Sequence, residues 1–556
     1  MNAKTSSSSN VRFKFASPVL WALALAAFLL FFRLGERPLR SPDEGRYAEI
    51  AREMVASGDW VRPTVFGVGY LRKPPLIYWL TAVSFRVFGE NEWSARVIPA
   101  FFGWLSILLV YWFGRRFFDS GRALYATLIL GTNLWAVQVS RYLLIDPVYS
   151  FFLTAAVFFF YAGAQTGKKN VFPFLFFGSL GFAFLAKGPS ALVIAGVPAI
   201  LYVVQKKRWN IFSDVSWWAG LGLFFLIALP WFILMSRREP GFFNFFFLHE
   251  NVQRFTATDF EHQEPWYYYL VMLPLLLMPW SLYPRTWFGD RTHDTRRFLW
   301  QAVYVIVVFF SLSRSKLATY LLPCFPLLAV LAADPWKRWT ESKPEDRLTD
   351  LAPALLLCFV GLGLIIGAPV FMKAQAGKYP EALSGDLQLL GGAILAGGVF
   401  AARSLKRGRL RYFFFSLVFL MAAVSLGVSR LTETVNPAYS NKAFAEKLRS
   451  DPKMDGEVFV FDHPGPFYDF AFYLKRPVKL VGLEGELEHF RQDARAGEVS
   501  VSREEFFSRI REKKPLVVLM RRSDYTEMDP ALRAELQILK QDRRKVLARS
   551  GPVVSP

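Results

Sequence analysis

The sequence is poor in the residues on which soluble catalysts and metalloproteins usually depend. Its 556 residues include two cysteines, Cys324 and Cys358, both inside apolar runs, which argues against a disulfide framework or a cysteine-based zinc site. Charged residues make up 20% of the chain, and no two of the five histidines have the helical spacing of metal ligands. No glycine-rich phosphate-binding loop lies in the segments predicted below to be cytoplasmic, which disfavours an ATP-driven machine.

Apolar and aromatic residues are abundant instead. They make up 53% and 17% of the chain, and the mean hydropathy is +0.25. This composition excludes a disordered chain, and many apolar runs are long enough to cross a bilayer. The net charge of +21 is carried mainly by the apolar part of the chain, because the residues after 429 are nearly balanced in charge. The excess therefore indicates basic loops between membrane spans rather than a surface that binds nucleic acid.

The apolar runs predict a polytopic α-helical membrane protein with about thirteen transmembrane helices. The predicted spans lie at residues 16–33, 94–113, 122–139, 146–165, 172–187, 189–205, 214–235, 265–284, 298–313, 317–334, 351–373, 386–402 and 411–428. Basic clusters fall in alternate loops, as expected for loops that face the cytoplasm. The opposite, periplasmic side then receives the loop 34–92, the loop 236–264 and all residues after 429.

The residues after 429 differ in character from the rest. Short strand-like runs alternate with helical patterns there, which predicts a small α/β domain. The predicted strands are 458–461, 478–481 and 516–520, and the predicted helices are 442–449, 466–473, 503–511 and 531–549. We therefore predict a transmembrane domain at 1–429 and a periplasmic domain at 430–556.

Two acidic residues at the predicted outer surface are candidates for catalysis. Ser41, Pro42 and Glu44 have the spacing of a helix start, followed by an amphipathic pattern that predicts a helix lying on the membrane surface. Asp43 would lie in the first turn, where the helix dipole favours its ionised form and Arg46 can hold it. A fixed carboxylate suits a general base, although first-turn acids also simply complement the dipole.

Asp146, at the outer start of a predicted span, is the second acidic candidate. An ionisable residue at a membrane edge is costly unless it is used or paired. The alternative is a helix cap before Pro147.

Cations also gather on the predicted outer side, where few are expected. They are Lys73, Arg141, Lys187, Arg254, Arg314 and Lys316. Their presence suggests an anionic ligand, most simply a lipid phosphate, while the alternative for any single one is snorkelling toward headgroups. Tyr320 is a further candidate because it neighbours these cations. His249 and His262 share one outer loop, but their spacing alone does not assign a metal.

Several short motifs occur in a fixed order between residues 40 and 325. They are Pro42-Asp43-Glu44 with Arg46-Tyr47-Ala48-Glu49-Ile50, Ser57-Gly58-Asp59-Trp60, Lys73-Pro74 with Tyr78-Trp79, Asp146-Pro147, Lys187-Gly188, Arg238-Glu239-Pro240, Gln253-Arg254-Phe255, and Lys316-Leu317 with Thr319-Tyr320-Leu321-Leu322-Pro323-Cys324. In this order the motifs resemble those of the bacterial aminoarabinose transferases of lipid A. That family belongs to the wider group of lipid-phosphate-sugar glycosyltransferases, which includes the protein mannosyltransferases.

The resemblance implies a GT-C type fold in the bacterial inner membrane, with the active site facing the periplasm. It implies a sugar donor carried on undecaprenyl phosphate and an acceptor such as lipid A. Asp43 would be the key acid near the acceptor, steered by Arg46, with Asp146 as a second acid. The leaving lipid phosphate would be bound by Lys73, Arg254 and Tyr320, with Lys187 as a weaker candidate.

Two positions depart from the family pattern. The family usually has Glu before the Lys-Pro pair and His before the x-Gln-Arg segment, where this chain has Arg72 and Asn251. Those positions have been linked to a metal contact and to donor handling, so no metal is assigned and a divalent ion is kept only as an alternative. An arginine beside the site would also repel a cationic amino sugar. The same chemistry on a protein or another glycan with a different sugar, or transport of a lipid-linked substrate, are the competing hypotheses.

Overall fold

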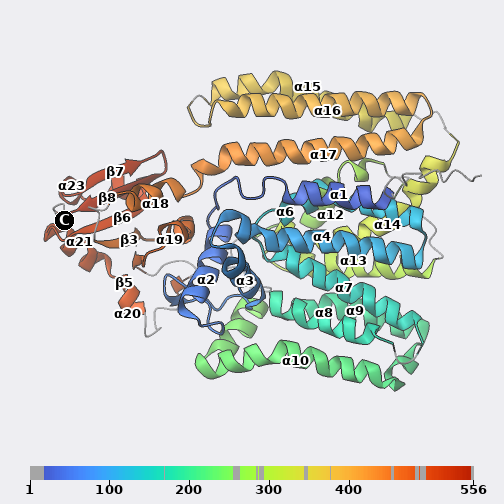
Figure 1. Cartoon of the computed structure of the whole chain (residues 1–556), viewed down its shortest axis with the longest axis horizontal. Coiled ribbons are helices and arrows are strands. Elements are labelled where there is room, and N and C mark those ends of the chain that lie inside the picture. Colours follow the sequence, from blue (N-terminus) through green and yellow to red (C-terminus); the bar gives the residue numbers. More distant parts are fainter. Residues whose placement is uncertain are drawn as a thin grey trace, which may run out of the picture.

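The computed structural model describes residues 18–167, 170–253, 263–283, 286, 293–343, 348–375, 377–451, 456–482, 487–488 and 496–551. Most of the helices run side by side in a bundle, and a C-terminal sheet lies beyond one end of this bundle (Figure 1). The α-helices of the bundle are α1 (Pro18–Phe31), α4 (Glu92–Phe117), α5 (Ser120–Gly131), α6 (Leu134–Ser140), α7 (Asp146–Gln165), α8 (Phe172–Lys187), α9 (Ser190–Lys206), α10 (Val215–Arg238), α12 (Tyr268–Leu276), α13 (Asp294–Leu312), α14 (Cys324–Glu341), α15 (Leu348–Ala374), α16 (Ala382–Lys406) and α17 (Leu410–Val435).

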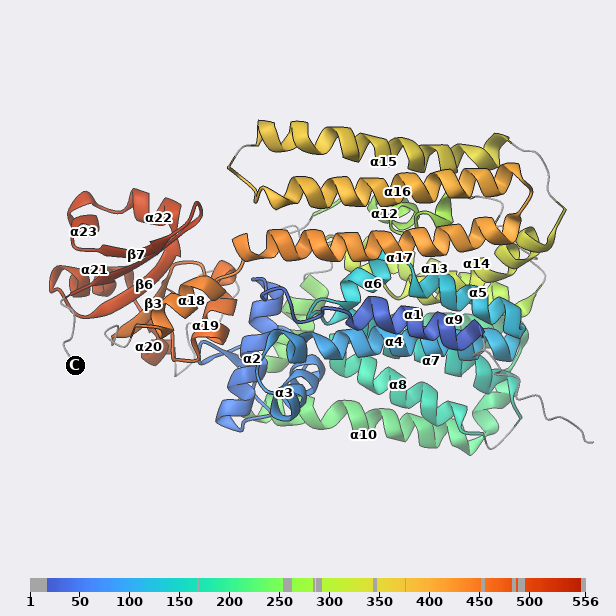
Figure 2. The same ribbon diagram turned by 45° about the horizontal axis from the view of Figure 1, so that its top comes forward.

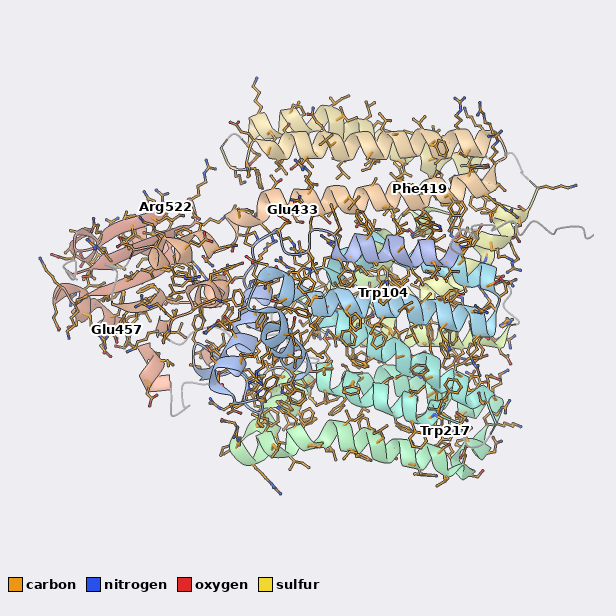
Figure 3. The ribbon with its side chains drawn as sticks, viewed as in Figure 1. Trp104, Trp217, Phe419, Glu433, Glu457 and Arg522 are labelled. Atoms are coloured by element: carbon orange, nitrogen blue, oxygen red, sulfur yellow. The ribbon has the colours of Figure 1, made fainter. Side chains whose placement is uncertain are left out.

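The bundle has the surface of a membrane protein. Among the described residues, seven helices are long and apolar enough to cross a membrane, and the bent pair α5 and α6, which meet at 61°, would make an eighth span. Large apolar side chains on the flanks of these helices are exposed, among them Leu226 at 71% and Phe419 at 67%. In Figure 3, Trp104, Trp217 and Phe419 lie in the helical part, whereas Glu457 and Arg522 lie on the C-terminal sheet domain. The prediction of a polytopic helical membrane protein is therefore confirmed.

Each predicted span overlaps a helical element. Four shorter apolar helices, α1, α3 (Leu76–Phe88), α8 and α9, accompany the longer ones. The predicted span 265–284 contains only α12 and the short helix η3 (Trp280–Leu282), and the predicted span 317–334 contains η5 (Ala318–Leu321) and the first part of α14. The sequence therefore located the helical segments, while length and composition alone qualify seven or eight as spans.

The segment predicted to form the first outer loop lies between the bundle and the sheet domain. It contains α2 (Asp43–Ser57), a two-stranded hairpin of β1 (Thr64–Val65) and β2 (Val68–Gly69), and α3 (Figures 1 and 2). The predicted helix is present as α2, but its polar face is buried against other parts of the protein. Glu44, Arg46 and Glu49 are each less than 7% exposed, because neighbouring elements cover α2 on both sides. Ion pairs on this side replace the solvent that an isolated amphipathic helix would need.

The C-terminal domain is built on a six-stranded mixed sheet with strand order β5-β4-β3-β6-β8-β7. Strands β5 (Ser500–Val501), β4 (Lys479–Val481), β3 (Glu457–Phe461) and β6 (Leu516–Arg521) are parallel, and β8 (Lys545–Ser550) and β7 (Gln537–Gln541) add an antiparallel edge. The accompanying α-helices are α18 (Lys442–Arg449), α19 (Tyr468–Leu474), α20 (Ala496–Val499), α21 (Arg503–Arg511), α22 (Arg522–Glu527) and α23 (Pro530–Ala534). The prediction of a small domain of alternating strands and helices is confirmed.

The helix predicted at 531–549 is wrong. That segment forms the short helix α23 and then the β7–β8 hairpin. Its turn is fixed by Asp542, whose Oδ1 accepts hydrogen bonds from the backbone N–H groups of Arg544 and Lys545. Val546, Leu547 and Ala548 are fully buried where β8 pairs with β6. Pairing of β8 with the buried central strand β6 is more favourable than the helix that the weak pattern of residues 531–549 suggests.

Candidate active site

Asp43 is the first residue of α2, and Arg46 holds it as predicted. Nη2 of Arg46 lies 2.5 Å from Oδ1 of Asp43, and the Asp43 side chain remains 49% exposed while that of Arg46 is 7% exposed. The guanidinium of Arg46 lies over the rings of Tyr47, Tyr70 and Tyr468 at 5.2, 5.4 and 5.7 Å. This cage of rings fixes the arginine, so one carboxylate oxygen of Asp43 is bound and the group is still open to a ligand.

Ser41 does not cap α2, which corrects the predicted helix start. Its hydroxyl donates to Oδ1 of Asp469 at 2.5 Å and accepts a hydrogen bond from the Asp469 backbone N–H at 3.0 Å. Residue 45 must be glycine here, because a Cβ would lie 2.4 Å from the Asp469 backbone nitrogen. The start of α2 is therefore docked against the C-terminal domain instead of closing its own first turn.

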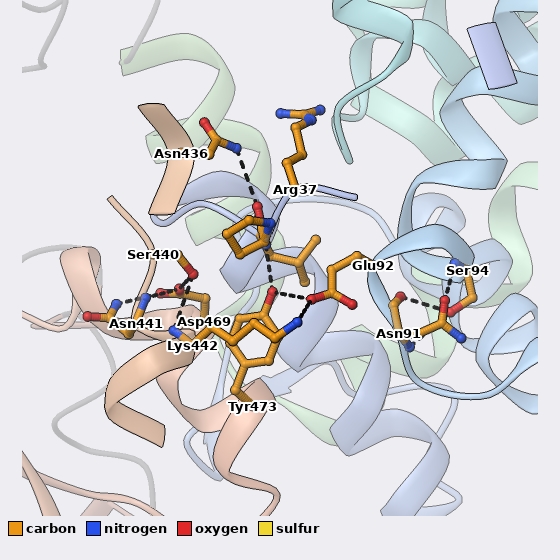
Figure 4. Close-up of polar contacts among 12 residues, drawn as sticks. Arg37, Asn91, Glu92, Ser94, Asn436, Ser440, Asn441, Lys442, Asp469 and Tyr473 are labelled. Carbon is orange, nitrogen blue, oxygen red and sulfur yellow. Dashed lines mark hydrogen bonds and ion pairs between the residues drawn. The ribbon is translucent and has the colours of Figure 1, made fainter. Parts of the chain in front are cut away.

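A second set of contacts joins the C-terminal domain to the bundle (Figure 4). The Tyr473 hydroxyl donates to Glu92 at 3.0 Å and accepts a hydrogen bond from the Leu39 backbone, and Lys442 pairs with the same Glu92 at 2.7 Å. Asp469 is fully buried and accepts hydrogen bonds from Ser440 and Asn441. The sheet domain is thus tied to the segment that carries Asp43.

Glu44, next to Asp43, fixes the same helix to the bundle. Its carboxylate pairs with Arg96 of α4 at 2.7 Å and accepts a hydrogen bond from the Leu143 backbone N–H, and Arg37 lies 3.8 Å away. Burial alone would raise the pKa of Glu44, but Arg96 and Arg37 lower it to about 2. Glu44 is therefore a structural anion, and its neighbour Asp43 is the exposed one.

Asp146, Lys187 and Tyr320 come together, although they are far apart in the sequence. Asp146 begins α7 and accepts a hydrogen bond from Nζ of Lys187, the last residue of α8, at 2.7 Å. The same Nζ lies 4.1 Å from the centre of the Tyr320 ring. The chain can turn directly after Lys187 because Gly188 adopts φ +78°, and a Cβ there would lie 3.0 Å from the Phe246 ring.

A cavity of about 590 Å³ opens beside this group. Lys73, Lys187, Glu250, Asn251 and Tyr320 supply polar groups to its wall. Most of the remaining lining is apolar and comprises Pro189, Val193, Phe243, Phe247, Leu248, Val252, Phe309 and Phe310. A cavity with cations among polar groups and a long apolar wall suits a molecule that joins a phosphate to a hydrocarbon chain.

The structure also shows residues that the sequence did not reveal as candidates. Glu250, on the π-helix η2 (Asn244–Gln253), has a 1% exposed side chain and pairs with Arg72 at 3.0 Å. The sequence signal that could have identified Glu250 is its position as an acid within an apolar predicted outer loop. Tyr47 is a second such residue, because both Asp43 and Asp146 act electrostatically on its hydroxyl. Burial, together with these two acids, raises the pKa of Tyr47 against the opposing effect of Arg46.

Two of the predicted outer cations form hydrogen bonds with backbone carbonyls. Arg141 donates to the backbone carbonyls of Leu29, Leu30 and Phe32, and Lys316 donates to the carbonyl of Glu264. Both therefore stabilise the fold through backbone carbonyls. Arg314 is exposed, and Arg254 and His262 lie outside the described residues.

The two departures at 72 and 251 do not fit a metal site. Arg72 cannot ligate a cation, and the side-chain amide of Asn251 donates to the Phe246 carbonyl. Across the ranges that the structure describes, no three His, Cys, Asp or Glu side chains gather as metal ligands would.

Comparison with known proteins agrees with this geometry. The family described as dolichyl-phosphate-mannose-protein mannosyltransferase matches residues 16–246. An undecaprenyl phosphate-α-4-amino-4-deoxy-L-arabinose arabinosyl transferase of Edwardsiella ictaluri is 31% identical, and the match covers 94% of this chain and 97% of that protein. The enzyme of the same name from Aeromonas hydrophila is 37% identical over 56% of this chain and 59% of its own length.

A solved structure matches over almost the whole chain. The crystal structure of ArnT from Cupriavidus metallidurans bound to undecaprenyl phosphate has a TM-score of 0.82 at 26% identity, covering 96% of this chain and 99% of that one. The fold and the site together define a multi-pass membrane glycosyltransferase. Within that class, the chain belongs to the family of the undecaprenyl phosphate-aminoarabinose arabinosyl transferases.

Proposed function

We propose that this protein transfers a sugar of the aminoarabinose type from undecaprenyl phosphate to lipid A at the periplasmic face of the bacterial inner membrane. The observation that carries the proposal is the cavity, in which Lys73, Lys187 and Tyr320 stand at the polar part of a long apolar wall. The names of the relatives supply the sugar and the carrier. We also propose the thirteen-span topology, with residues 1–429 as the membrane domain and 430–556 as the periplasmic domain.

The proposed reaction is a displacement at the sugar carbon that carries the phosphate. An acceptor oxygen forms a bond to this carbon while its bond to the phosphate oxygen breaks, and undecaprenyl phosphate leaves with the electron pair. Lys73 and Lys187 would stabilise the charge of the leaving phosphate, with Tyr320 and Arg254 as further ligands. Asp146 would act mainly by holding Lys187 in place, because the two groups already form an ion pair.

Asp43 would act on the other reactant. A phosphate acceptor is already ionised and needs little deprotonation, so the carboxylate held by Arg46 would orient the acceptor or the sugar. A hydroxyl acceptor would instead need Asp43 as a general base.

One observation favours a second candidate, the same transfer with a different sugar. Arg72 lies directly beside Lys73 and carries a positive charge that a cationic amino sugar would have to approach. Its partner Glu250 offsets this charge. We therefore retain a neutral sugar, or another envelope glycan or protein acceptor, as the alternative.

Mass spectrometry of lipid A tests the proposal. We expect lipid A from cells that express the protein to carry an added mass of one sugar, which is lost on deletion and restored by complementation. The mass increment distinguishes an amino pentose from a neutral sugar. Unmodified lipid A, with the protein expressed and the donor pathway present, would contradict the lipid A assignment.

A further inference from the structure

Many arginines at this end of the molecule are paired with carboxylates. The pairs include Arg33 with Glu433, Arg37 with Glu44, Arg46 with Asp43, Arg62 with Glu239, Arg72 with Glu250, Arg238 with Asp59, Arg503 with Asp462, and Arg509 with Glu457.

Four exposed cations from three segments far apart in the sequence gather near Tyr439. Arg40 precedes α2, Lys378 lies in the α15–α16 turn, and Arg543 and Arg544 lie in the β7–β8 turn. We call these four residues the outer cation cluster. All four are exposed, and in the described part of the chain none of them forms an ion pair with a carboxylate.

The cluster is held together by close contacts. The guanidinium carbons of Arg544 and Arg40 lie 4.1 and 4.6 Å from the centre of the Tyr439 ring, and Arg544 donates to the Tyr439 hydroxyl at 3.2 Å. This hydrogen bond and the charges of Arg544, Arg40 and Lys378 lower the pKa of the Tyr439 phenol. A Cβ at Gly377 would lie 2.8 Å from Nη2 of Arg543, so this arginine reaches the α15–α16 turn.

Asp542, the acid that precedes Arg543 in the sequence, forms no ion pair with the cluster within the described part of the chain. The Asp542 carboxylate accepts the backbone N–H groups of Arg544 and Lys545 and so closes its own turn. The turn is fixed further by Arg522, whose backbone N–H donates to the Arg544 carbonyl and whose Nη1 donates to the Asp542 carbonyl. Three segments far apart in the sequence thus bring like charges together, with no carboxylate ion-pair partner among the described residues, at a cost in repulsion that a bound anion would remove.

The cluster is also close to the candidate catalytic acid. Arg40 is three residues before Asp43, so their Cα atoms are within about 11 Å of each other. The Arg40 backbone is fixed on the first turn of α2, because its N–H donates to Glu44 and its carbonyl accepts from Gly45. An anion held at Arg40 would therefore keep a constant distance from Asp43.

We propose that the outer cation cluster binds a phosphate group of the acceptor glycolipid, other than the group that receives the sugar, and so orients the acceptor at Asp43. This inference rests on the proposed function, because it assumes that the acceptor is a phosphorylated lipid. The two planar guanidinium groups beside the Tyr439 ring offer several N–H donors to phosphate oxygens.

The test measures sugar transfer by the full-length enzyme in lipid nanodiscs, with lipid A that carries two phosphates and with lipid A from which one has been removed. The test variant is R543E/R544E, and the matched control is R511E/R533E, which places the same charge change on α21 and α23 at the far edge of the same domain (Figure 1). We expect the test variant to raise the acceptor KM about tenfold or more with an unchanged donor KM, and the control to change neither. We also expect the test variant and the wild type to have similar KM values for monophosphorylated lipid A.

The experiment distinguishes failure of the proposed function from failure of the cluster inference. If the wild-type enzyme transfers no sugar to any lipid A, the proposed function fails before the cluster is tested. If the wild type is active and R543E/R544E leaves the acceptor KM unchanged, the cluster inference alone is overturned. If the effect of the variant follows the phosphatidylglycerol content of the nanodisc and not the phosphates of the acceptor, the cluster binds bulk lipid headgroups, and the inference is likewise overturned.

Discussion

At the scale of single residues, the Asp43 carboxylate differs from the neighbouring acids because only one of its oxygens is held in an ion pair and its side chain stays half exposed. Glu44 is buried between two arginines, and Asp146 forms an ion pair with Lys187. Asp43 also has an arginine partner, but about half of its side chain is exposed to solvent. The pairing of Asp43 with Arg46 was predictable because three residues separate them on one helix.

Asp43→Asn is therefore expected to reduce kcat by about 100-fold or more, because the amide keeps the shape but loses the charge. The thermal unfolding temperature should change little, since the side chain is half exposed. The rate of sugar transfer by the purified protein checks this. Asp59→Asn is the matched control, because Asp59 lies in the same outer segment and also pairs with an arginine, Arg238. Full activity of the Asp43 variant would remove Asp43 from the site.

Lys187→Met is expected to weaken binding of undecaprenyl phosphate by about 10-fold to 100-fold, the effect of losing one charge-assisted hydrogen bond. Lys187→Arg should restore part of this affinity, because it keeps the charge and the pairing with Asp146. Equilibrium binding of the lipid to the purified variants measures the effect. The control is Lys206→Met. Lys206 is the last residue of α9, far from the turn that follows Lys187, and it pairs with Asp294. Equal affinity in the Lys187 and Lys206 variants would contradict the assignment.

The pairing of Lys187 with Asp146 and of Arg72 with Glu250 could not be derived from the sequence. Each pair joins residues on different elements, and nothing in the local pattern fixes which acid meets which base. The sequence identified Lys187 and Asp146 separately, by their unusual charge at a membrane edge. Glu250 was hidden by its aromatic surroundings.

At the scale of elements, apolar runs located the membrane helices because burial in lipid requires long stretches of apolar residues. The Ser41 cap and the helix at 531–549 were wrong for one shared reason. In both places a contact with a distant segment, Asp469 or β6, replaced the local structure that the pattern favours. Local signals predict an element well only when no distant partner competes for its polar groups.

The end of α2 contains an acid whose protonation should affect stability. Glu53 is half-buried, and it accepts hydrogen bonds from Thr64 and Gly67 of the β1–β2 hairpin. Burial, followed by the negative charge of Glu49, raises the pKa of Glu53. The folded protein therefore keeps this proton to a higher pH than the unfolded chain does, and the stabilisation present below the ordinary pKa of 4.5 is lost as the pH rises through the raised value.

Glu53→Gln, which cannot ionise, should remove this pH dependence. We expect the variant to gain stability relative to the wild type between about pH 5 and about pH 9. Thermal unfolding of both proteins at the two pH values measures the difference. An exposed acid of the sheet domain, Glu505, provides the control variant Glu505→Gln. A wild-type protein that becomes more stable than Glu53→Gln at the higher pH would contradict the sign.

At the scale of the whole molecule, the sheet domain, the α2–α3 segment and the α15–α16 turn lie at one end of the bundle (Figures 1 and 2). This end carries Asp43 and the outer cation cluster, so the site and the proposed acceptor contact share one side of the membrane. A transporter would need a path to both sides. The one-sided arrangement suits an enzyme that meets two lipids in the same leaflet.

The thirteen-span topology can be checked by labelling single cysteines in intact cells with the outer membrane permeabilised. Glu381, at the start of α16, and Arg407, at its end, are both exposed and lie at opposite ends of one helix. We expect a membrane-impermeant maleimide to label Glu381→Cys and leave Arg407→Cys unlabelled, because the basic α16–α17 turn should face the cytoplasm. Ser523→Cys, exposed on the sheet domain, should be labelled like Glu381→Cys. The native Cys324 is buried and Cys358 is half-buried, so the background should be low. Labelling of Arg407→Cys in place of Glu381→Cys would reverse the orientation of the last helices and place the sheet domain in the cytoplasm, away from any periplasmic acceptor.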